Sequence, residues 1–176
     1  MQRSLYQPGF SHLSLANLTA QSAEQLSLAT IPLVAVLLLQ SSIGDIGLLT
    51  AMGTLPFLLL SIPLGTLADR MPRQRLMQWG ESLRLAVLLL MVLALQSTQL
   101  NVAWLAALCF TGAVGTVAFS VATPGLVSSL VPSRLLPQAN AQLETSRSIA
   151  FASGPALAGA LVAWVGGLPT LVLAVL

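Results

Sequence analysis

Glu24 is the residue with the clearest potential for chemistry, because it lies inside a long and mostly apolar run. Helical spacing places Gln21 one turn before it and Asn17 two turns before it, on the same face. A carboxylate deep in a membrane helix is costly and usually functional, which suggests proton coupling or recognition of a cationic group. The shared polar face favours the wall of a water-filled cavity. A buried carboxyl that holds helices together by hydrogen bonds is the structural alternative.

Two pairs of opposite charge have the i, i+3 spacing that lets side chains meet on a helix. They are Glu81 with Arg84, and Glu144 with Arg147. Each pair lies in the first turns of an expected helix, where Arg84 can extend its charge along the apolar surface and Glu144 suits the helix dipole. We interpret both as structural ion pairs.

Catalytic and metal-binding residues are scarce. The chain has one histidine, His12, and one cysteine, Cys109, too few ligands for a zinc site. It contains no nucleophile elbow and no phosphate-binding glycine loop. We therefore expect no enzyme activity, no metal and no cofactor.

The amino-acid composition indicates the environment in which the protein folds. Charged residues make up 7% of the 176 residues, hydrophobic residues make up 56%, and the mean hydropathy is +0.88. Soluble domains carry about 25% charged residues. The formal net charge of +2 is too small to suggest nucleic-acid binding. The sequence predicts an all-α, polytopic helix bundle in a lipid bilayer.

Polar and turn residues divide the chain at the interval that a bilayer requires, roughly 20 residues per helix. We expect a cytoplasmic segment at 1–12 and five complete spans, at about 13–39, 46–68, 76–95, 102–122 and 143–165. The fourth continues less hydrophobically to residue 130. A sixth run, 168–176, is less than half a span, so we expect a truncated sixth helix.

The arginines predict the orientation, because cytoplasmic loops are enriched in basic residues. Arg70, Arg73 and Arg75 follow the second span, and Arg134 follows the fourth. The connections after the first and third spans carry no basic residue. These arginine-bearing connections and the amino terminus are therefore expected in the cytoplasm.

Residues 65–75 contain a motif. Their sequence GTLADRMPRQR resembles G-x-L-A-D-R-x-G-R-[KR]-x, the signature loop between the second and third helices of the major facilitator superfamily. Pro72 and Gln74 depart from the pattern. Gly65 and Asp69 share a helix face, so the glycine would allow close helix approach and the carboxylate would face the arginines. The matching residues are Gly65, Leu67, Ala68, Asp69, Arg70, Arg73 and Arg75.

Two further stretches point to exporters in that superfamily. Gly154, Pro155 and Gly159 resemble the G-P-x-x-G-G element of the fifth helix, with Ala158 departing from it. Small residues there suit close helix packing, and proline kinks a helix. Residues 123–141 are similar to a connection in a drug and siderophore exporter branch, which includes macrolide efflux and enterobactin exporter-like proteins.

The resemblance covers essentially the whole chain. It implies that residues 13–176 form the incomplete amino-terminal half of a twelve-helix antiporter, a multi-pass protein of the plasma (inner) membrane. Such a transporter moves small amphiphilic or cationic compounds outward in exchange for protons, by rocking two halves about a midplane site. The partners would be a small-molecule substrate, the bilayer, protons and the missing carboxy-terminal half. The alternative is a non-transporting fragment or membrane scaffold.

Overall fold

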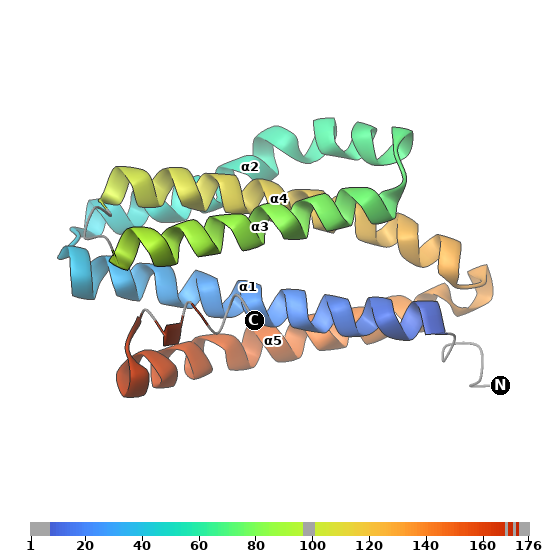
Figure 1. The fold of residues 1–176 in the computed structure, drawn as a ribbon. Coiled ribbons are helices and arrows are strands. Elements are labelled where there is room, and N and C mark those ends of the chain that lie inside the picture. The colour runs from blue at the N-terminus through green and yellow to red at the C-terminus, as the bar shows by residue number, and fades with distance from the viewer. Residues whose placement is uncertain (1–7, 97–100, 168, 171, 173–176) are drawn as a thin grey trace.

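The computed structural model describes residues 8–96 and 101–167, together with residues 169, 170 and 172. The described residues form helices and no strand, which confirms the prediction of an all-α bundle. Five helices are long, and one short 3-10 helix precedes the last of them (Figure 1). Their bounds are α1 Pro8–Leu39, α2 Ile43–Arg70, α3 Arg73–Gln96, α4 Val102–Leu130, η2 Ser133–Leu135 and α5 Leu136–Val165.

The helices pack as two groups. α4 packs extensively against both α2 and α3, and α1 packs extensively against α5, whereas contacts between the two groups are sparse. Figure 1 shows α1 and α5 along one side of the molecule and the other three helices along the opposite side. We refer to these as the α1–α5 pair and the three-helix group.

Glycines set the closest crossings inside each group. A Cβ on Gly80 of α3 would lie 2.6 Å from the carbonyl oxygen of Gly115 on α4, and a Cβ on Gly115 would lie 2.5 Å from that of Gly80. In the α1–α5 pair, a Cβ on Gly154 would lie 2.5 Å from the Cβ of Gln25. Small residues let membrane helices approach closely, so these glycines fix the spacing within each group.

Four helical segments are long and apolar enough to cross a membrane, by length and composition: residues 43–70, 73–96, 102–130 and 133–165. α1, expected as the first span, is 32 residues long but is not among the four. Its amino-terminal and middle turns carry the polar residues Asn17, Gln21, Glu24 and Gln25.

Two helices begin earlier than expected. α1 begins at Pro8 and takes residues 8–12 from the predicted amino-terminal segment, whose residues 1–7 lie outside the described part. α5 begins at Leu136 instead of near residue 143. Apolar character defined the predicted spans, but both helices continue through polar residues, and a proline is tolerated in a first helical turn. Most of the predicted sixth run, 168–176, lies outside the described residues.

Candidate functional site

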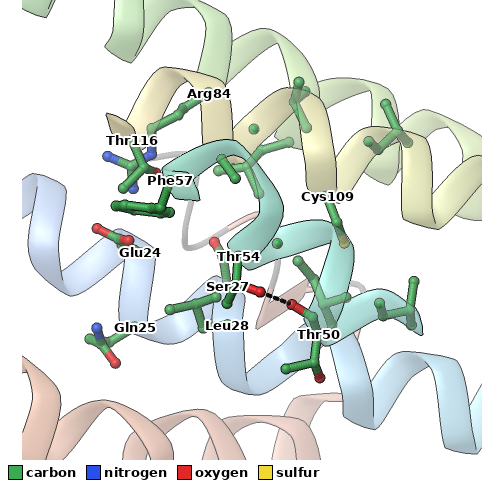
Figure 2. Close-up of a pocket in the computed structure, with 18 of the residues that line it drawn as sticks. Glu24, Gln25, Ser27, Leu28, Thr50, Thr54, Phe57, Arg84, Cys109 and Thr116 are labelled. Carbon is green, nitrogen blue, oxygen red and sulfur yellow. Dashed lines mark hydrogen bonds between the residues drawn. The ribbon is translucent and has the colours of Figure 1, made fainter. Parts of the chain in front are cut away.

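A cavity of about 400 Å³ lies between the two helix groups. All five long helices contribute to its lining, so residues that are far apart in the sequence come together around it. α1 and α2 supply the hydroxyl groups of Ser27, Thr50 and Thr54. Figure 2 shows these side chains around the cavity, with Glu24 and Arg84 toward one end and Cys109 toward the other.

Charged side chains are concentrated near Glu24. Arg84 of α3 and Arg147 of α5 line the cavity together with Glu24. The Glu24 carboxyl group lies within electrostatic range of Arg84, Arg147 and Glu81. Among the described residues, Glu24 forms no ion pair, whereas Arg84 and Arg147 each pair with a carboxylate of their own helix.

Asn17, Gln21 and Glu24, which the sequence placed on one face of α1, do not all face the cavity in the structure. Gln21 and Glu24 line the cavity, while Asn17 is buried and is not part of the lining. Asn17 lies about 10 Å along the axis from Glu24, at 1.5 Å per residue. The polar face that these three residues share therefore extends beyond the cavity. Gln25 also lines the cavity, although it was not among the candidate site residues selected from the sequence.

Arg84 has a larger role in the geometry than its sequence spacing indicates. Its Nη1 atom lies 2.7 Å from Oε1 of Glu81, so the expected pair forms. In addition, Nη2 donates a hydrogen bond of 3.2 Å to the carbonyl oxygen of Ala20 on α1. The residue is only 8% exposed and faces the cavity. The sequence has no local signal for this contact, because 64 residues separate the two partners.

The Glu144–Arg147 pair is more exposed. Arg147 Nη1 lies 3.7 Å from Glu144 Oε1, and both side chains are more than half exposed. Arg147 nevertheless lines the cavity. The sequence analysis interpreted this pair as structural and did not predict that position.

The signature segment forms a shorter turn than the sequence suggests. Asp69 and Arg70 belong to the last turn of α2, and Arg73 begins α3, so only Met71 and Pro72 connect the helices. Met71 is extended, with φ −126° and ψ 159°. The carbonyl oxygen of Pro72 accepts the N–H of Arg75 at 2.9 Å. This connection requires no positive φ, so proline serves where the family pattern has glycine.

Side chains of the signature segment are mostly on the surface. The Asp69 carboxylate faces Arg73 at 3.8 Å, as expected from the spacing, and is 77% exposed. A Cβ on Gly65 would meet nothing within 4 Å, so the expected close helix approach at Gly65 is wrong within the described helices. The bundle-facing side of this part of α2 carries Leu64 and Ala68, which are buried. Leu67, Arg70 and Arg75 are exposed.

Only part of the exporter-like element of α5 packs against another helix. Gly154 meets Gln25 of α1 closely, and Ala158 is fully buried. A Cβ on Gly159 would meet nothing within 4 Å, so Gly159 makes no close approach to the described helices. Pro155 lies inside the helix, where proline removes a backbone hydrogen bond.

Long apolar helices around a cavity that carries charged and polar side chains among apolar ones define a polytopic membrane protein with a solute-sized space. Comparison with protein-family models matches residues 5–176 to the transmembrane secretion effector family, which is of the major-facilitator type. The chain belongs to this family, and the family indicates a membrane transporter with an efflux role. The resemblance to major-facilitator exporters is thereby confirmed. Comparisons with curated proteins and with solved structures give no match.

Proposed function

We propose that residues 13–176 are the amino-terminal half-bundle of a proton-coupled exporter of small amphiphilic or cationic compounds. It lies in the plasma membrane with its amino terminus in the cytoplasm, works by alternating access with a carboxy-terminal half, and catalyses no reaction. The observation that carries the proposal is the position of Glu24, which faces the cavity without an ion-pair partner among the described residues.

The charge balance of the site explains why Glu24 would couple two solutes. Five charged groups determine this balance. The Glu24 carboxylate and the guanidinium groups of Arg84 and Arg147 line the cavity, and the carboxylates of Glu81 and Glu144 pair with the two arginines. With all five ionised, the net charge is −1. One proton on Glu24, or one bound cation, brings it to zero. A net charge is costly inside a membrane, so the site favours either occupant over an empty ionised state.

The same balance makes the two occupants exclusive. A proton and a cationic substrate bound together would give the site a charge of +1. Proton entry would therefore release the substrate, which is the requirement for exchange. The cavity volume of about 400 Å³ lies in the range typical of small-molecule sites. Apolar residues such as Ile31, Phe57 and Met91 would accommodate the apolar part of an amphiphilic compound.

Substitution of Glu24 by Gln tests the proposal, because it keeps the shape and hydrogen bonding and removes the titrating carboxyl group. In the complete transporter, we expect the variant to insert normally, to lose proton-driven export and to show a flattened pH profile in everted membrane vesicles. Asp45→Asn is the matched control, since Asp45 forms a capping box with Ser42 outside the cavity. It should keep the pH profile. An unchanged profile for Glu24→Gln would show that Glu24 is a structural carboxyl group.

A further inference from the structure

Arg84 is the charged residue that is buried among the described residues, and it lies where the two helix groups meet. A buried guanidinium group is costly unless it is paired and hydrogen-bonded. Its aliphatic stem passes Gly115, where a Cβ would lie 2.8 Å from the Arg84 Cγ. The close crossing of α3 and α4 at Gly80 and Gly115 thus directs the guanidinium group toward α1.

The hydrogen bond from Arg84 to the Ala20 carbonyl connects the two helix groups. Among the hydrogen bonds of the described residues that join different helices, the other side-chain bond, from Gln142 to Ser14, lies within the α1–α5 pair. In an α-helix the carbonyl of residue 20 also accepts the N–H of residue 24. Arg84 is therefore fixed to the turn of α1 that ends at Glu24.

Two carboxylates compete for this guanidinium group. Glu81 holds Nη1 at 2.7 Å, while Glu24 faces the same part of the cavity from α1 (Figure 2). An arginine carries five N–H donors, more than Glu81 and the Ala20 carbonyl require. α5 adds Arg147 to the surroundings of Glu24, and α4 adds the uncharged hydroxyl group of Thr116. The Cys109 thiol of α4 lies toward the other end of the cavity.

We propose that Arg84 is a positioning residue that changes its carboxylate partner with the state of Glu24. When Glu24 is protonated or covered by a cation, Arg84 remains on Glu81 and the Ala20 carbonyl. When Glu24 is ionised and empty, Arg84 turns to Glu24 and draws α1 toward α3, which narrows the cavity. The inference rests on the proposed role of Glu24 and adds the side chain that transmits its charge to the helix arrangement.

A distance measurement between the two helix groups tests this inference. Spin labels are attached to cysteines replacing the exposed residues Leu15 of α1 and Leu85 of α3, in a Cys109→Ser background. Distances are measured by double electron–electron resonance in lipid nanodiscs across a pH series. We expect shorter distances at alkaline pH, and reversal of the shift when the lipophilic cation tetraphenylphosphonium is added.

Variants of the two partners separate a positioning role from a purely structural one. Arg84→Gln should lose the pH-dependent shift, whereas Arg134→Gln, at an exposed arginine of η2, should keep it. Glu81→Gln removes the competing carboxylate and should enlarge the short-distance population at alkaline pH. It carries the test if Arg84→Gln fails to fold.

Three results would overturn the inference: no shift in the parent, a full shift in Arg84→Gln, or no enlargement in Glu81→Gln. These results are distinct from failure of the proposed function. A transporter whose Glu24→Gln variant loses proton-dependent export, but whose Arg84→Gln variant keeps the shift, would retain the function and lose only the positioning role.

Discussion

Replacement of Gly115 by Ala tests whether the α3–α4 crossing determines the stability of the three-helix group. The new methyl group would lie 2.5 Å from the Gly80 carbonyl oxygen and 2.8 Å from the Arg84 Cγ. A backbone carbonyl cannot move without its helix, so the two helices must separate. Overpacking of this kind costs about 3 kcal/mol at the upper end of its usual range. Alanine recovers about 1 kcal/mol through its higher helix propensity.

The net expectation is a loss of about 2 kcal/mol, a roughly 30-fold lower ratio of folded to unfolded protein. It is measured by denaturant unfolding of the purified protein in detergent micelles, followed by circular dichroism. Gly47→Ala in α2 is the matched control, because a Cβ there would meet nothing within 4 Å. The control should be stabilised by up to about 1 kcal/mol. If Gly115→Ala is as stable as Gly47→Ala, the close crossing does not exist in the membrane protein.

Two further outcomes concern the orientation and the signature segment. Cysteines replacing the exposed residues Ile43 and Gln74, in a Cys109→Ser background, should differ in labelling by a membrane-impermeant thiol reagent added outside intact cells. Only the cysteine at position 43 should react, and the reverse pattern would invert the proposed topology. Asp69→Asn should change the unfolding free energy by less than about 1 kcal/mol, since its ion pair with Arg73 is exposed. It should nevertheless slow export by the complete transporter, and normal export would limit Asp69 to a surface role.

The sequence predicts the helices well because hydropathy is a local property of the chain. The predicted spans 46–68, 76–95 and the continuous run 102–130 correspond closely to α2, α3 and α4. The early starts of α1 and α5 were missed because their first turns are polar, and hydropathy alone does not register a polar helix.

The candidate site could be predicted only in part. Glu24 and Gln21 could be identified because they are polar residues within a mostly apolar run, and this pattern is visible within a single helix. The approach of Arg84 to Ala20, and of Gly154 to Gln25, depends on how helices pack across the bundle. The partners in such contacts are not separated by any regular sequence spacing, so a single sequence does not reveal them. The openness around Gly65 was missed for the same reason, since a glycine in a motif does not reveal which neighbour it faces.

The hydroxyl groups of the cavity wall have a consequence for the polarity that a solute encounters. Ser27 donates its hydrogen to the carbonyl oxygen of Ala23 at 2.8 Å, and Thr50 and Thr54 donate to carbonyl oxygens one turn back in α2 at 2.9 and 3.1 Å. Each hydroxyl has one hydrogen and two lone pairs, so the hydrogen is already engaged and the lone pairs remain. This part of the wall therefore resembles a row of ether oxygens. It accepts hydrogen bonds from ammonium or amide groups without any rotation of its own side chains, and it offers no donor to a solute that carries only acceptors.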